Sequence, residues 1–178
     1  MDIKLVEKFK SIFTGLDRAH GVFEKSNEPQ EGYKVEAQMK TVHEPPTLEK
    51  FSNHLKGEYP AMGIVPIDDN NQCLFGAIDI DVYPLDHKKL IKKISDKKFP
   101  LVTCLSKSGG AHLYIFLRQK VFAKELQTKL SEITTALGYP SAEIFPKQVK
   151  LFQREGEEKR DTGSWINLPY HGRNRYAL

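Results

Sequence analysis

The sequence predicts a mixed α+β fold, and three observations lead to that prediction. Segments with the apolar spacing of helices alternate with segments that have the spacing of strands. Two neighbouring strand-like stretches flank the loop 106–111 and are close enough to form a hairpin, so a purely parallel sheet is disfavoured. The chain has 178 residues, of which 39% are hydrophobic and 28% charged, which is enough for one domain or for two small modules that share a core.

The first half of the chain predicts two helices and two short strands. Apolar side chains at helical spacing in the first helix are Leu5, Val6, Phe9, Ile12 and Phe13. The second helix has a capping threonine, Thr47, and a terminating glycine, Gly57. The predicted elements are a helix over 5–13, a strand at 33–37, a helix over 47–57 and a strand over 62–66.

The second half begins with the stretch Leu74–Tyr83, which alternates in the manner of a strand. Ile78 and Ile80 share one face, whereas Asp79 and Asp81 share the other. The elements predicted after it are a helix over 86–97, a hairpin of strands at 101–105 and 112–117, a helix over 123–137, and strands within 142–148 and 163–172.

Composition narrows the class of protein. No run of 18 apolar residues and no signal peptide is present, so we expect a cytoplasmic protein with no membrane partner. Cys73 and Cys104 lie in apolar stretches without metal-ligand spacing and are expected to be buried free thiols, which disfavours a zinc module. The net charge of +4 permits a polyanionic partner without proving one.

Asp79 and Asp81 are the first candidate site residues. On a strand their carboxylates lie roughly 7 Å apart on one face, an arrangement that suits hard divalent cations such as Mg²⁺. A polar edge of a half-exposed strand is the alternative, but aspartate is rare in strands with apolar residues on both sides. Glu143 is a candidate for a third carboxylate, although a single glutamate is more often a solvated surface residue.

The loop before the second hairpin strand is the second candidate. It offers two hydroxyls, an ammonium group and a glycine backbone that can approach phosphate oxygens closely. An ordinary hairpin turn explains the same residues, and neither the Walker nor the dinucleotide-binding order is present. The candidate nucleotide-binding residues are Ser106, Lys107, Ser108, Gly110 and His112.

Four motifs in order resemble the archaeo-eukaryotic primase superfamily. They are DID at 79–81, SKSGGAH at 106–112, EIFPKQ at 143–148 and GSWINLPYHG at 163–172. The resemblance is closest to the primase-polymerase domains of phages, plasmids, TOTE conflict systems and CRISPR-associated proteins, and the segment 9–23 is similar to their N-terminal element. It implies an N-terminal α/β module packed on an RRM-like module with a mixed sheet, and an active site between the two.

The resemblance also implies roles for residues. Asp79, Asp81 and Glu143 match the catalytic, metal-binding positions, although the third position is often Asp in the family. The loop Ser106–Ser108 and His112 match the element that grips the triphosphate. The implied activity is a template-dependent nucleotidyltransferase, a DNA primase and polymerase, which uses two divalent ions, Mg²⁺ or Mn²⁺.

The implied partners are a single-stranded DNA template with its primer, nucleoside triphosphates and, in a longer chain, a helicase or other domains. Lys147, Lys150 and Arg154 are candidates for template contacts because they follow the acidic strand, with solvated surface charge as the alternative. The sequence stops at Leu178, where relatives continue. Residues 1–178 are therefore expected to be a catalytic core, either complete or a fragment of a longer protein.

Two other functions stay open. One is a non-catalytic module that binds single-stranded nucleic acid by stacking on Tyr114, Phe116 or Trp165. The other is a metal-dependent nuclease, because paired carboxylates also serve hydrolysis. The triphosphate-type loop argues against the nuclease.

Overall fold

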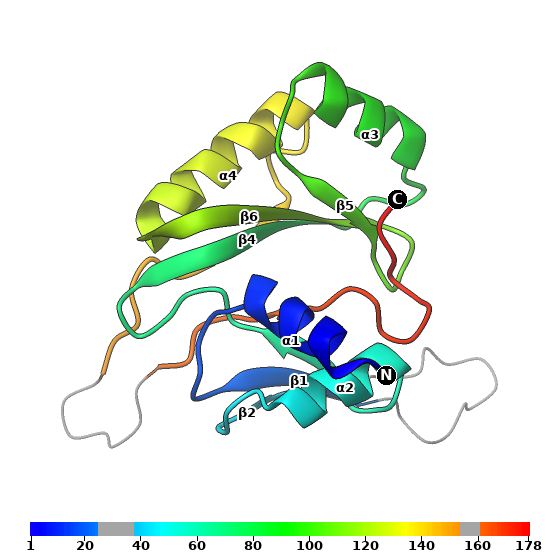
Figure 1. Cartoon of the computed structure of the whole chain (residues 1–178). Helices are drawn as coiled ribbons and strands as arrows, with labels where there is room; N and C mark the ends of the chain where they lie inside the picture. Colours follow the sequence, from blue (N-terminus) through cyan, green and yellow to red (C-terminus); the bar gives the residue numbers. More distant parts are fainter. Residues whose placement is uncertain (25–37, 154–160) are drawn as a thin grey trace.

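The computed structural model of the chain describes residues 1–24, 38–153 and 161–178. These residues form four helices and two antiparallel four-stranded sheets, which confirms the mixed α+β class (Figure 1). The strand orders are β2-β1-β3-β8 and β5-β6-β4-β7. The elements are α1 (Ile3–Ile12), β1 (His20–Glu24), β2 (Gln38–Val42), α2 (Leu48–Lys56), β3 (Ala61–Ile64), β4 (Gln72–Ile80), α3 (His87–Asp96), β5 (Val102–Leu105), β6 (Ala111–Phe122), α4 (Ala123–Leu137), β7 (Glu143–Phe145) and β8 (Ile166–Asn167).

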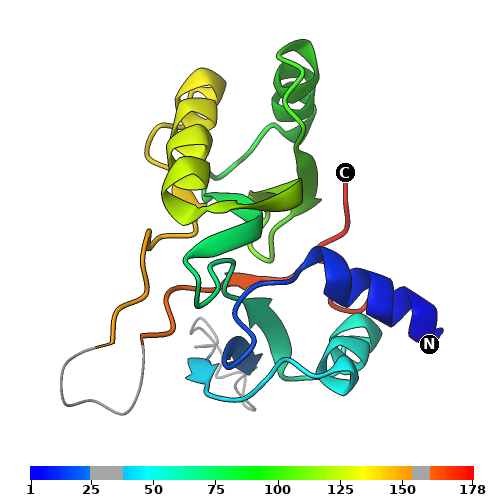
Figure 2. The ribbon, with the colours of Figure 1, turned by 60° about the vertical axis from the view of Figure 1, so that its left-hand side comes forward.

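The second sheet has two apolar faces. Helices α3 and α4 cover one of them, as Figures 1 and 2 show. Ile78 and Ile80 of β4 belong to the apolar cluster under these helices, whereas Phe75 and Ala77 belong to the cluster on the other side. Because side chains alternate along a strand, Asp79 lies on the face away from α3 and α4, as the sequence predicts.

That other face is closed by α1 along part of its length. The ring centroid of Phe13 lies 5.3 Å from each of the ring centroids of Phe75, Tyr114 and Phe116. Tyr114 is 1% exposed. Since a ring buried in this way has no free face, Tyr114 cannot stack on a base, which corrects that part of the nucleic-acid-binding alternative.

Helix ends follow the predicted signals. The side chain of Thr47 accepts a hydrogen bond from the main-chain N–H of Lys50, and Gly57 ends α2 in the left-handed region at φ 85°. Asp86 caps α3 in the same way, and Gly138 ends α4 at φ 82°. These residues satisfy main-chain groups that a helix leaves unpaired at its ends, so the predicted boundaries hold to within about one residue.

The first helix buries fewer side chains than its apolar residues predict. Val6, Phe9 and Phe13 are buried, but Leu5 and Ile12 are 54% and 40% exposed. Val6 and Phe9 belong to the apolar cluster that also contains residues of α2 and the second sheet, whereas Leu5 and Ile12 face outward.

The strands of the first sheet differ most from prediction. The sequence does not predict β1, and the strand expected at 33–37 lies outside the described residues. In the predicted strand 163–172 only β8 is strand. The N–H of Leu168 still donates to Met62 (2.9 Å), but Pro169 has no N–H and ends the pairing.

Both cysteines are buried free thiols, as predicted. Burial raises the pKa of Cys73 to about 12 and that of Cys104 to about 11, so both remain protonated and unreactive at neutral pH. No helix in the described parts of the chain is long and apolar enough to cross a membrane.

The segment 161–178, which we call the C-terminal strap, contacts both sheets. Its strand β8 pairs with β3 of the first sheet. Farther on, the N–H of Leu105 in β5 donates to Tyr176, and the N–H of Leu178 donates to Thr103, each at 2.9 Å. The strap therefore runs from one sheet to the other along the boundary between them (Figure 2).

Candidate active site

Three predicted site residues form one row across the second sheet. Asp79 of β4 lies opposite His112 of β6 on one side and opposite Glu143 of β7 on the other. Directly opposed residues of antiparallel strands point to the same face, so these side chains stand next to one another. Asp81 follows the end of β4, is exposed, and accepts a hydrogen bond from the hydroxyl of Tyr83 (2.7 Å).

The side chains of this row face a cleft of about 630 Å³, which is lined by residues from both sheets. Strand β2, the loop between β5 and β6, and the C-terminal strap form its walls. The predicted site residues in the cleft are Asp79, Asp81, Ser106, Lys107, Ser108, His112, Glu143 and Lys147. The structure thus brings together residues that lie up to 68 positions apart in the chain (79 to 147).

A chain of hydrogen bonds fixes the orientation of the His112 ring. The hydroxyl of Tyr114 donates to the main-chain oxygen of Asn167 (2.6 Å), so its oxygen is free to accept from Nδ1–H of His112 (3.2 Å). The Nε2 atom then faces Asp79, 3.2 Å from Oδ1. This contact is not aligned as a hydrogen bond, and Oδ1 of Asp79 is unpaired.

Unpaired buried polar atoms gather in this cleft. Among the described residues, four buried side-chain atoms lack a hydrogen-bond partner: Oδ1 of Asp79, Oγ of Ser106, Oδ1 of Asn167 and Nη1 of Arg175. All four residues line the cleft. Each such atom costs about 1–3 kcal/mol of stability, so their concentration at one place indicates a site built for a polar ligand.

Arg175 is a site residue that the sequence does not single out. It is 5% exposed, and burial lowers the pKa of its guanidinium group. Its φ of 57° lies in the left-handed region, which is uncommon for arginine. Its guanidinium carbon lies 5.8 Å from the ring centroid of Phe23, whose ring also contacts the ammonium of Lys107 at 3.9 Å.

Trp165 forms a wall of the cleft by lying flat on two glycines. Gly21 of β1 and Gly63 of β3 are paired in register. A Cβ atom at Gly21 would lie 1.9 Å from the Trp165 ring, and one at Gly63 would lie 2.3 Å from it. Only glycine leaves room for the indole at these positions, so base stacking on Trp165 is restricted to its other side.

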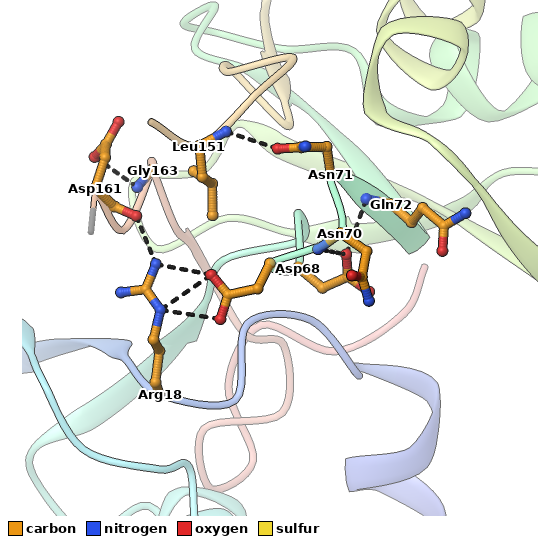
Figure 3. Close-up of polar contacts among 9 residues, drawn as sticks. Arg18, Asp68, Asn70, Asn71, Gln72, Leu151, Asp161 and Gly163 are labelled. Carbon is orange, nitrogen blue, oxygen red and sulfur yellow. Dashed lines mark hydrogen bonds and ion pairs between the residues drawn. The ribbon is translucent and has the colours of Figure 1, made fainter. Parts of the chain in front are cut away.

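The start of the C-terminal strap is fixed by Arg18 (Figure 3). Its guanidinium group donates to both carboxylate oxygens of Asp69 at 3.0–3.1 Å and to the main-chain oxygen of Asp161 at 2.7 Å. Asp161 in turn accepts from the N–H of Gly163 (3.0 Å). The strap therefore enters the cleft in a defined position, which sets the places of Ser164 and Trp165.

The family model for the archaeo-eukaryotic primase domain of the TOTE conflict system matches residues 6–177. The chain belongs to this primase family. The match spans all four motifs and both sheets, and membership points to a nucleotidyltransferase of the primase type. None of the curated proteins matches the chain.

Primase domains of this kind use divalent metal ions, and the donors present fit such ions in part. Asp79 has an unpaired carboxylate oxygen, and Asp81 is two residues away, so both offer the hard oxygen ligands that Mg²⁺ and Mn²⁺ prefer. Glu143, however, is engaged by the ammonium of Lys147 at 2.7 Å. Among the described residues, no group of three or more acidic, histidine or cysteine side chains is placed so that it could hold a metal ion.

Two further predicted residues, Gly110 and Lys150, do not line the cleft. Gly110 is buried, and its carbonyl accepts from the N–H of Ser106 (3.0 Å). A Cβ atom there would lie 2.2 Å from the carbonyl oxygen of Ile80, so Gly110 lets the loop pack closely on β4. Lys150 is exposed and contacts the ring of Phe152, and Arg154 lies outside the described residues.

Proposed function

We propose that the chain is a template-dependent nucleotidyltransferase, a DNA primase-polymerase that joins nucleotides along a single-stranded DNA template. The observation that carries this proposal is the shared cleft: the row of Asp79, His112 and Glu143 faces the same space as the phosphate-type loop and the unpaired polar atoms. Family membership supports the class of reaction. The β-α-β-β-α-β chain order of the second sheet supports an RRM-like module.

The loop between β5 and β6 and the C-terminal strap supply groups for the triphosphate. Oγ of Ser106 and Nη1 of Arg175 are buried donors without a partner, and ionised phosphate oxygens are acceptors for both. Lys107 adds positive charge from the same loop, next to the hydroxyl of Ser108. His112 is oriented by Tyr114, which leaves Nε2 as the ring nitrogen that faces Asp79 and the cleft; Nε2 donates to a phosphate oxygen when both ring nitrogens carry protons.

The proposed reaction transfers a nucleotide to a primer. The 3′-hydroxyl oxygen bonds to the α-phosphorus, the bond from that phosphorus to the oxygen of the β-phosphate breaks, pyrophosphate leaves, and the hydroxyl proton passes to water. Two divalent ions, when bound, neutralise charge on the triphosphate and lower the pKa of the hydroxyl. Asp79 and Asp81 would hold them, with Glu143 joining once Lys147 releases it.

Template contacts are proposed for basic residues beyond β7. Lys147 and Lys150 are both exposed, and Lys147 lines the cleft. Exposed lysines bind phosphates through charge without reading bases, which suits a template of any sequence.

An extension assay tests the proposal. The protein is incubated with Mg²⁺ or Mn²⁺, a primed single-stranded DNA template and labelled deoxynucleotides or ribonucleotides, beside the Asp79→Asn variant as the control. The expected result is primer extension by the parent and none by the variant. Cleavage of the template would instead identify a nuclease, and retention of DNA without either reaction would identify a binding module.

A further inference from the structure

A second groove lies against the same carboxylates. Its volume is about 330 Å³, and it is lined by the end of β4 and by the turn between α4 and β7. Asp79, Asp81 and Glu143 line both this groove and the larger cleft. The carboxylates therefore form a ridge that two separate binding spaces can approach.

The two spaces differ in charge. The larger cleft is lined by four cationic side chains, Lys40, Lys107, Lys147 and Arg175. Among the described residues that line the smaller groove, none is a lysine or arginine. The ammonium of Lys93, which lies beside Gly138, is engaged by the carbonyl of Leu137 at 2.7 Å. A triphosphate placed in the smaller groove would face three carboxylates without cationic partners there.

The groove has instead the surface that a nucleoside needs. Val82, Tyr139 and Pro140 offer apolar and aromatic contacts, and Ser141 offers a hydroxyl. The turn that carries them is fixed, because the N–H of Tyr139 donates to Thr134 (2.8 Å) and its carbonyl accepts from Ala142 (3.0 Å). A space of this size lies at the lower end of the range for small-ligand pockets, about 300–1,000 Å³.

We propose that this groove binds the 3′-terminal nucleoside of the primer and excludes a second nucleoside triphosphate. The inference rests on the proposed function. It places the triphosphate in the larger cleft on one side of the carboxylate ridge, and the primer end in the smaller groove on the other side. The primer end needs no cation at its sugar and base, and its 3′-hydroxyl reaches the ridge from the side opposite the triphosphate. Extension of a primer should therefore be faster than synthesis from free nucleotides alone.

The variant Ser141→Trp tests the assignment, because Ser141 is exposed and a large side chain there fills the groove without entering the core. Ser11→Trp, at an exposed position on α1 that lines neither space, is the matched control. Binding is measured by fluorescence anisotropy, without catalysis, for a labelled primed template and for the same template without its primer. Nucleotide binding is measured separately by calorimetry.

We expect Ser141→Trp to weaken binding of the primed template about tenfold, the scale of one lost stacked base, while binding of the unprimed template and of nucleotide stays within about twofold of the parent. Equal loss for both templates, or a loss of nucleotide affinity, would overturn the assignment. Unchanged binding of the primed template would overturn it as well. Because these readouts need no turnover, an inactive parent would refute the proposed function without deciding the role of the groove.

Discussion

Replacement of Arg175 by methionine should separate substrate binding from folding. If Nη1 donates to a phosphate, its loss removes a hydrogen bond to a charged group worth about 1.5–3 kcal/mol, and nucleotide affinity falls about 10- to 150-fold. In the free protein the same nitrogen is buried and unpaired, which costs about 1–3 kcal/mol. Methionine keeps much of the aliphatic volume next to Phe23, so the melting temperature should stay unchanged or rise.

The assay pairs calorimetric titration of a non-hydrolysable nucleoside triphosphate with thermal unfolding of the free protein. Arg173→Met is the matched control, since Arg173 is exposed and does not line the cleft. Unaltered nucleotide affinity in Arg175→Met would refute the binding role. A large drop in melting temperature together with a loss of affinity would show that Arg175 supports the fold instead.

Three further predictions concern single residues. Asp79→Asn should abolish nucleotide addition without lowering the melting temperature, because it removes a carboxylate oxygen that has no partner; extension at the parental rate would contradict the metal-binding role. His112→Ala should weaken nucleotide binding about 10- to 100-fold and leave template binding unchanged, as calorimetry with both ligands can show. Burial lowers the pKa of His54 to about 3, so the folded protein binds fewer protons than the unfolded chain, and this residue alone should lower the free energy of unfolding by up to about 1.4 kcal/mol for each pH unit below about 6.5. Urea denaturation between pH 7 and pH 5 measures this slope; a flat profile would mean that His54 binds protons equally in the folded and unfolded chains, and that its contacts with Met62 and Pro169 differ from those described.

The second sheet was predictable because its signals are local. The alternation around Asp79 needs only neighbouring residues, and Gly138 ends α4 through its own backbone conformation. The row of Asp79, His112 and Glu143 is different. Its members follow from the motif resemblance, but their alignment depends on strand register, which a β-bulge between Cys73 and Phe75 shifts.

Residues supplied by the strap were harder to predict. Arg175 has no apolar periodicity around it, and an arginine is usually expected at the surface. Its burial depends on the path of the strap after β8 and on a left-handed backbone at Arg175 itself. Arg175 is recognised as a site residue by its buried, unpaired guanidinium group, and this feature is visible only in the structure.

The sequence does not predict strand β1, and the reason is related. Gly21 lies at the centre of a short buried strand, where glycine weakens a strand pattern, and it is there because Trp165 occupies the space of a side chain. The requirement comes from a residue more than a hundred positions away in the chain.

The strap has a consequence for cooperativity. One continuous segment completes a ladder in each sheet, through β8 on β3 and through Tyr176 and Leu178 on β5. Neither sheet can unfold without releasing the strap, and the strap also pairs with the other sheet. Heating should therefore give one transition, with the fluorescence of Trp165 at the boundary and the circular dichroism of the helices changing together.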